Sequence, residues 1–186
     1  DERGMLFFEM VKILKAKKPR AFIAENVKGL LSANKRKAFP LIIKEFGNAG
    51  YNVKFKLFNT SDYGVPQKRE RVIIVGFRDA GDYERFDFPT PVTAKTKVSL
   101  KEVLDPDADK NDKWFFSDKA VKGMLLVKEK MNKGRAQNVN EPCNTISAHL
   151  AKVSLNSTDP VLKIHERYRR LTPDECARIQ SFPDTF

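Results

Sequence analysis

The feature that most constrains the fold is a short apolar run, Ala21 to Ala24, that stops at two polar residues, Glu25 and Asn26. An apolar run without polar alternation is typical of a parallel strand that is covered on both faces. In open α/β sheets, ligands bind just beyond the carboxyl ends of such strands. The carboxylate and the amide are therefore candidates for chemistry. The alternative is that they cap the next helix or hold a turn.

The segments around this run alternate between helical and extended patterns. The apolar residues that recur at helical spacing before it are Leu6, Phe7, Met10, Val11 and Leu14. They predict an amphipathic helix. A second helix is predicted over residues 38–46, with Pro40 in its first turn. Residues 51–58 predict a half-exposed strand with alternating lysines, and residues 72–77 predict a buried strand. The chain is therefore expected to be of the α/β class.

Further blocks give this pattern a specific meaning. In chain order, residues 25–27, 67–71 and 170–184 resemble the sixth, eighth and ninth motifs of the DNA (cytosine-5) methyltransferase family. Residues 1–9 resemble the fifth motif. The resemblance implies the second half of a Rossmann-like, S-adenosylmethionine-dependent methyltransferase sheet, followed by an irregular target-recognition region. It divides the chain into a catalytic part (1–78), a recognition region (79–165) and a supporting segment (166–186).

The resemblance also assigns roles to residues. It implies that Glu25 contacts N3 of a flipped cytosine and that Arg71 reaches O2, with Arg69 bracing the site. A spacing of two in a strand would place both arginines on one face. For the acid role, the Glu25 carboxyl would have to carry or share a proton. The other residues that the resemblance assigns are Leu6 (touching S-adenosylmethionine) and Asn26, Gln67, Thr145 and Arg170 (substrate or DNA).

The composition agrees with a nucleic-acid partner. Thirty-five Lys and Arg residues against 24 Asp and Glu give a formal net charge of +11. This charge suits binding to double-stranded DNA, but a protein with a lysine-rich surface and no such partner would have the same composition. The two cysteines, Cys143 and Cys176, lie far apart in sequence and do not predict a disulfide or a metal site. Cys176 is expected to be a buried helix residue rather than a nucleophile. A reduced, cytoplasmic, DNA-associated bacterial protein is expected.

Three family elements are absent from these residues: the glycine-rich turn for S-adenosylmethionine, the Pro-Cys segment with the nucleophile, and the final Asn-containing motif. We therefore expect a fragment of a longer enzyme, or one subunit of a split enzyme whose partner polypeptide carries the first four motifs, inactive alone. The long variable stretch after Arg78 favours DNA as substrate. The alternatives are a transfer-RNA cytosine methyltransferase and a non-catalytic DNA-recognition subunit.

Overall fold

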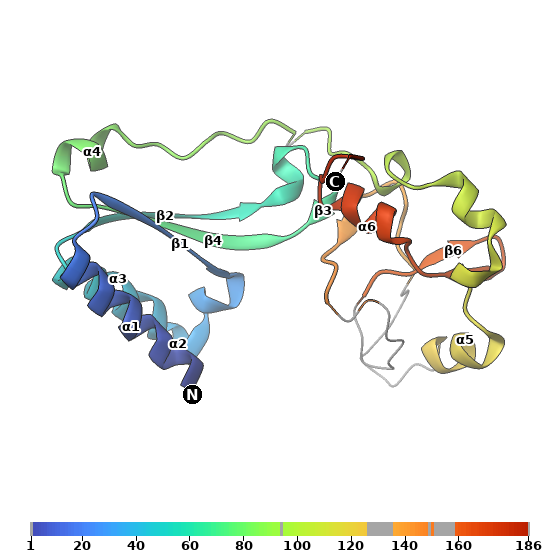
Figure 1. The fold of residues 1–186 in the computed structure, drawn as a ribbon, viewed down its shortest axis with the longest axis horizontal. Coiled ribbons are helices and arrows are strands. Elements are labelled where there is room, and N and C mark those ends of the chain that lie inside the picture. Colours follow the sequence, from blue (N-terminus) through green and yellow to red (C-terminus); the bar gives the residue numbers. More distant parts are fainter. Residues whose placement is uncertain (1, 94, 126–135, 149, 151–158, 186) are drawn as a thin grey trace. The chain divides into compact units, whose positions relative to one another are not determined.

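A computed structural model describes residues 2–93, 95–125, 136–148, 150 and 159–185 (Figure 1). The chain forms two compact units. Unit 1 contains Asp1–Phe58 and Glu70–Thr90, and unit 2 contains Asn59–Arg69 and Pro91–Phe186. Residues 59–69 thus group with the later part of the chain, and residues 79–90 group with the earlier part. The assignment of catalytic and recognition roles to segments stays a prediction.

Unit 1 is built on a three-stranded sheet in the order β1-β4-β2, formed by β1 (Ala21–Val27), β4 (Glu70–Phe77) and β2 (Asn52–Asn59). β1 pairs with β4 in antiparallel register, from Ala21 opposite Phe77 to Val27 opposite Arg71. The predicted α/β sheet is confirmed, but the prediction that β1 is a parallel strand covered on both faces is wrong. Its side chains alternate, with Phe22 buried and Ile23 73% exposed, as in a strand whose two faces are covered unequally.

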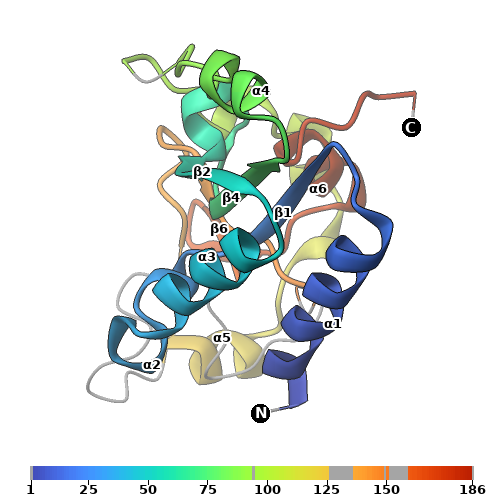
Figure 2. The ribbon, with the colours of Figure 1, turned by 90° about the vertical axis from the view of Figure 1, so that its left-hand side faces the viewer.

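Two helices cover the face of the sheet that carries Phe22, α1 (Glu2–Lys17) and α3 (Ala38–Asn48), as Figures 1 and 2 show. Both predicted helices are confirmed. The buried core between them and the sheet consists of Val11, Leu14, Phe22, Phe39, Phe46, Tyr51, Val72 and Ile74. α3 ends two residues before Gly50, whose φ of 87° is one that residues with a side chain rarely adopt. Between β1 and α3 lie a short 3-10 helix, η1 (Lys28–Leu31), and α2 (Ala33–Arg36).

The opposite side of the sheet carries α4 (Ala80–Arg85) and the segment that follows it (Figures 1 and 2). Arg20 at the start of β1 holds Asp82 with an Nε to Oδ2 distance of 2.6 Å. This hydrogen bond lowers the pKa of Asp82 to about 2. The carboxylate therefore stays charged at neutral pH and fastens α4 to unit 1.

β2 is extended, as predicted. Its lysines, however, contact other parts of the protein and do not simply face the solvent. Lys54 Nζ donates to the carbonyl of Phe86 at 2.5 Å and lies 4.9 Å from the Tyr83 ring centroid. Phe55, in contrast, is 49% exposed. The segment after β4 returns across the lysine side and offers carbonyls and rings, which the local alternation pattern could not indicate.

Unit 2 consists of short elements joined by long connections, as an irregular region was expected to be. β3 (Gln67–Lys68) pairs in parallel with β5 (Cys143–Asn144), and β6 (Leu162–Ile164) pairs antiparallel with β7 (Arg167–Arg169). The helices are α5 (Asp118–Leu125), α6 (Pro173–Ile179) and the 3-10 turns η2 (Thr60–Tyr63), η3 (Leu100–Glu102), η4 (Pro106–Lys110) and η5 (Asp112–Trp114). The sequence over residues 119–133 predicts a basic, helical piece; α5 covers its first part, and residues 126–133 lie outside the described residues.

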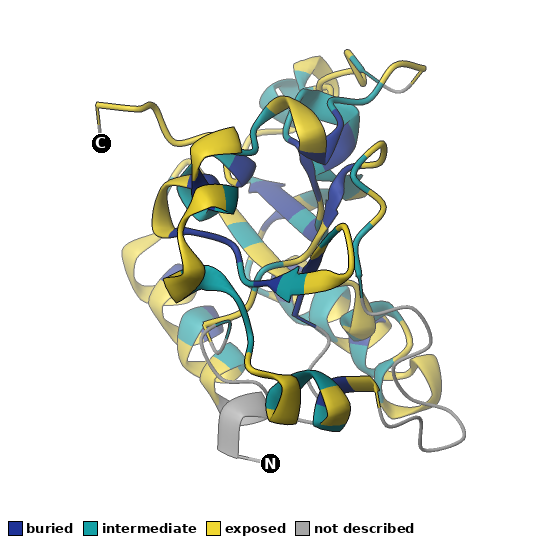
Figure 3. Ribbon diagram, turned by 90° about the vertical axis from the view of Figure 1, so that its right-hand side faces the viewer, coloured by how far each residue is buried: buried dark blue, intermediate teal, exposed yellow. Residues whose placement is uncertain are grey.

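The order Thr172-Pro173-Asp174-Glu175 predicts a helix that begins with a capping box, and α6 begins in this way. The Thr172 hydroxyl accepts from the Glu175 N–H at 3.1 Å, and the Glu175 carboxylate accepts from the Thr172 N–H at 2.8 Å. Pro173 occupies the first turn. Ile179 and Cys176 then pack on the core of unit 2, formed by Leu100, Cys143, Leu162, Leu171 and Ile179. Figure 3 shows how the buried residues concentrate on the strands, while the helices expose one side.

We expect Gly76→Ala to destabilise unit 1. A Cβ at Gly76 would lie 2.1 Å from a ring carbon of Phe22, its partner across the β1-β4 pair. Forcing a methyl group into a packed core costs about 1–3 kcal/mol. Urea unfolding measures this loss. Gly47→Ala is the matched control, because nothing lies within 4 Å of its added Cβ and alanine in a helix gains about 0.5–1 kcal/mol over glycine. Equal stability of the two variants would contradict the packing described.

Candidate active site

The best-defined polar pair on the sheet joins β1 and β4. Arg71 Nε lies 2.7 Å from Glu25 Oε1, with 20% and 52% of the two side chains exposed. The register explains the contact, because Val27 faces Arg71 across the pair and Glu25 lies two residues away on the same face. The pair therefore lies on the sheet face that α1 and α3 leave uncovered. The water-excluding enclosure expected around Glu25 is not present in the described part of the chain.

Two further contacts lie beside this pair. Arg71 Nη1 donates to its neighbour's carbonyl, Glu70 O, at 2.8 Å. Lys28 Nζ lies 2.9 Å from both carboxylate oxygens of Glu70, which ties η1 to the start of β4. The sequence reasoning missed this second pair, because no local pattern links residues 42 positions apart.

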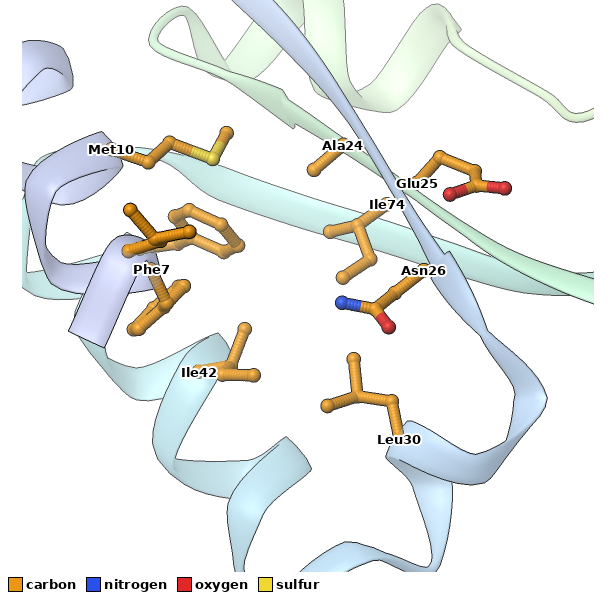
Figure 4. Close-up of a pocket in the computed structure, with 10 residues that line it drawn as sticks. Phe7, Met10, Ala24, Glu25, Asn26, Leu30, Ile42 and Ile74 are labelled. Carbon is orange, nitrogen blue, oxygen red and sulfur yellow. The ribbon is translucent and has the colours of Figure 1, made fainter. Parts of the chain in front are cut away.

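Asn26 lies on the opposite face of β1 from Glu25. Its amide points into a cavity of about 250 Å³, while the Glu25 carboxylate points away from it (Figure 4). The residues that line the cavity are Leu6, Phe7, Met10, Ala24, Glu25, Asn26, Leu30, Ile42, Phe46 and Ile74. Asn26 Oδ1 accepts from the Val27 N–H at 2.9 Å, so the Nδ2 side of the amide is turned toward the cavity. The two polar residues that end the apolar run are thus in the strand itself, and neither caps a helix.

Leu6 borders the same cavity from α1 and is 68% exposed. An apolar wall with one amide suits part of a nucleoside or of a thioether chain. The volume is below the range of sites that enclose a whole ligand of that size, about 300–1,000 Å³. A group of that kind could therefore enter the cavity only in part.

Arg69 is not in a strand. It lies between β3 and β4, and its carbonyl accepts from the Thr60 N–H at 3.1 Å. The alternation of a strand therefore does not extend to Arg69, and its placement on the same face as Arg71 stays a prediction. Its bracing role stays a prediction.

Gln67 and Thr145 are brought together in unit 2. Gln67 is 2% exposed, and its carbonyl accepts from the Thr60 hydroxyl at 2.5 Å. The Thr145 hydroxyl donates to the carbonyl of the next residue, Lys68, at 2.8 Å. Both residues thus hold the β3-β5 junction. Gln67 Nε2 is buried and has no hydrogen-bond partner among the described residues.

The most deeply buried arginine of the ninth-motif segment is Arg169. Arg169 is 1% exposed and forms a two-pronged ion pair with the buried Glu175, with distances of 2.8 and 2.9 Å. Its Nε contacts Asp109 at 2.6 Å, and Glu175 also accepts from the Asp105 N–H at 3.0 Å. Desolvation alone would lower the pKa of Arg169, but the hydrogen bonds from its two carboxylate partners raise it. Arg169 ends β7 with its side chain buried, and Arg170, which follows the strand, is half-buried; the role of Arg170 toward DNA stays a prediction.

Neither thiol is poised for attack. Cys143 is fully buried, and burial raises its pKa to about 12. Burial likewise raises the pKa of Cys176 to about 11. Both are therefore protonated at neutral pH, whereas nucleophilic cysteines have lowered pKa values. Cys176 lies on α6, as expected, but it is half-buried rather than buried.

Within the described residues, no three His, Cys, Asp or Glu side chains gather in a way that could hold a metal ion. His149, considered with the cysteines at the sequence level, lies outside these residues. The helices of the described part also lack the length and apolar character needed to cross a membrane.

A sequence profile described as C-5 cytosine-specific DNA methylase matches residues 1–186. The chain belongs to this family. Among curated relatives, the Type II methyltransferase M.FnuDI of Fusobacterium nucleatum is 40% identical over 210 residues, and the match covers 100% of this chain and 61% of the relative. The Type II methyltransferase M.SsoII of Shigella sonnei is 37% identical, with 100% and 50% covered.

Solved methylase structures share the fold. The S. pombe Dnmt2 methyltransferase superposes with a TM-score of 0.68 at 15% identity, covering 96% of this chain and 59% of that one. A putative DNA modification methyltransferase from an E. coli prophage gives 0.64 at 18% identity, covering 99% and 65%. The chain thus spans about half to two thirds of the methylases that it matches, and the predicted fold class is confirmed.

Proposed function

We propose that these residues activate cytosine for methylation at C5 in double-stranded DNA. The observation that carries the proposal is the 2.7 Å contact between Glu25 and Arg71. Cytosine C5 is a poor nucleophile until a thiolate adds to C6, and this addition pushes negative charge onto N3 and O2 of the ring. N3 and O2 are adjacent on one ring edge, so a neighbouring acid and guanidinium can serve both.

In this proposal the Glu25 carboxyl takes up a proton as the base enters and donates it in a hydrogen bond to N3, while Arg71 donates to O2. The ion pair holds the two groups together in the free protein, and the base edge replaces their mutual contact when it enters. Since a cytosine in a duplex is unreachable, the base must leave the stack, which costs a few kcal/mol. The surplus of cations can offset this cost through phosphate contacts. S-adenosylmethionine, when bound, supplies the methyl group that C5 takes. Leu6 and Asn26 border the cavity that would receive part of it.

The thiolate must come from outside the two cysteines of this chain. Cys143 is buried and Cys176 is half-buried, and both have raised pKa values, so neither can add to C6 at neutral pH. We therefore propose that the 186 residues do not transfer a methyl group unaided. The remaining part of the enzyme, as a longer chain or as a partner polypeptide, would supply the nucleophile. The Type II names of the relatives support a bacterial restriction-modification role and a cytoplasmic site of action.

The test compares the chain alone with a complemented protein, meaning the chain mixed with the part of M.FnuDI that lies outside the match. Transfer of labelled methyl from S-adenosylmethionine to plasmid DNA is measured, with transfer RNA as a second substrate. We expect transfer to plasmid DNA only on complementation, and equal transfer when Cys176 is replaced by serine. Methylation of DNA by the chain alone would contradict the proposal, and preferential methylation of transfer RNA would favour the RNA enzyme.

A further inference from the structure

One basic side chain of unit 2 has no role in the site described above. Arg170 follows β7 and is half-buried, and its Nε is fully shielded from solvent without a hydrogen-bond partner in the described part of the chain. Its guanidinium carbon lies 5.0 Å from the Phe116 ring centroid. A shielded guanidinium nitrogen that makes no hydrogen bond lowers the stability of the folded protein. The Arg170 guanidinium would therefore be stabilised by a hydrogen-bond acceptor on a ligand.

Arg170 borders a cavity of about 330 Å³. Trp114, Leu150, Leu171 and Cys176 contribute apolar walls, and none of the residues that line the cavity is acidic. Segment 114–116 runs beside β7, because the Arg170 N–H donates to the Trp114 carbonyl at 3.0 Å and the Phe116 N–H donates to the Tyr168 carbonyl at 2.9 Å. The backbone therefore fixes Trp114 and Arg170 on one wall.

The charges around the cavity favour an anion. Lys113 Nζ lies 4.6 Å from the Trp114 ring centroid and adds a second cation at this edge. The neighbouring Arg167 is already satisfied, since its Nη2 lies 2.9 Å from Asp112 and its guanidinium stacks on Phe115 at 3.9 Å. The guanidinium fork matches the geometry of phosphate oxygens. The apolar wall suits the sugar next to a phosphate, and the cavity is larger than a phosphate alone requires.

We propose that this cavity binds one backbone phosphate of the DNA duplex, with Arg170 on the phosphate oxygens and Trp114 against the adjoining deoxyribose. This inference rests on the proposed function for the identity of the polyanion. The contact would fix the position of the DNA without reading its sequence.

The experiment uses Trp114, which is the single tryptophan of the chain, as a fluorescent reporter. A duplex of mixed sequence is titrated into the protein at several salt concentrations. We expect the emission of Trp114 to change on binding. Arg170→Gln should abolish that change and reduce the slope of log affinity against log salt by about 1, as for one lost phosphate contact. Arg167→Gln is the matched control. It should keep both the emission change and the salt slope, because Arg167 is paired with Asp112 and not with DNA.

A second measurement needs no variant and so does not depend on folding of the mutant. Inorganic phosphate added to the unmodified protein should change the Trp114 emission, relative to chloride at matched ionic strength. An Arg170→Gln protein with the unmodified salt slope, or an emission that phosphate leaves unchanged, would overturn the inference. If the unmodified protein binds no duplex at any salt concentration while phosphate still alters the emission, the pocket stands and the proposed DNA function fails.

Discussion

Replacement of Glu25 by alanine lowers the rate of methyl transfer by the complemented protein about 10²- to 10⁴-fold, the range that a positioned general acid contributes. The loss is expected because the addition at C6 places charge on N3, and alanine offers no donor there. Stability should change little, since Glu25 is 52% exposed and exposed ion pairs contribute about 0–1 kcal/mol. Single-turnover transfer at saturating DNA measures the effect.

Glu70→Ala is the matched control for this variant. It removes a carboxylate from the neighbouring strand that is ion-paired with Lys28 and 41% exposed. We expect its transfer rate to stay within a few-fold of the unmodified rate. Glu25→Gln tests the need for a proton, because the amide can donate a hydrogen bond to N3 but cannot transfer a proton. A Glu25→Ala protein as fast as the Glu70→Ala control would exclude Glu25 from catalysis.

Replacement of Glu175 by alanine should cost about 3–5 kcal/mol of the free energy of unfolding of unit 2, the range for breaking one side of a buried pair. The variant leaves the Arg169 guanidinium, 1% exposed, with Asp109 as its remaining carboxylate. It also removes the acceptor of the Asp105 and Thr172 N–H groups. Urea unfolding, followed by far-ultraviolet circular dichroism, measures the loss.

The control here is Glu166→Ala. Its carboxylate lies 3.3 Å from Lys163 and is 93% exposed, so its removal should change stability by less than about 1 kcal/mol. Glu175→Gln adds a finer comparison, because it keeps the shape and loses the charge. Equal unfolding midpoints for the Glu175→Ala and Glu166→Ala proteins would show that the buried network does not hold unit 2 together.

Local rules accounted for the features that depend on neighbours in sequence. The α6 cap at Thr172 and the helix pattern of α1 need only residues three or four positions apart, and both were predicted correctly. The strand that pairs with β1 was not predicted correctly, because strand pairing depends on contacts between segments that are distant in sequence. An apolar run cannot indicate that β4 lies antiparallel beside it or that Ile23 remains 73% exposed.

The candidate site shows the same division. The motifs pointed to Glu25 and Arg71, and the structure places the two side chains in contact. Asn26, in contrast, lies on the other face of β1, since adjacent residues in a strand point to opposite sides. Arg169 rather than Arg170 is the fully buried arginine, a choice between two identical neighbours that depends on Glu175 and Asp109.

The account depends most on the claim that Glu25 and Arg71 together prepare cytosine to accept a methyl group at C5. Mass spectrometry of nucleosides from plasmid DNA treated with the complemented protein tests this claim directly. The account predicts 5-methyl-2′-deoxycytidine as the methylated product, and a large decrease in its rate of formation for both Glu25→Ala and Arg71→Ala. Methylation at the cytosine amino group or on adenine, or undiminished 5-methyl product from either variant, would contradict it.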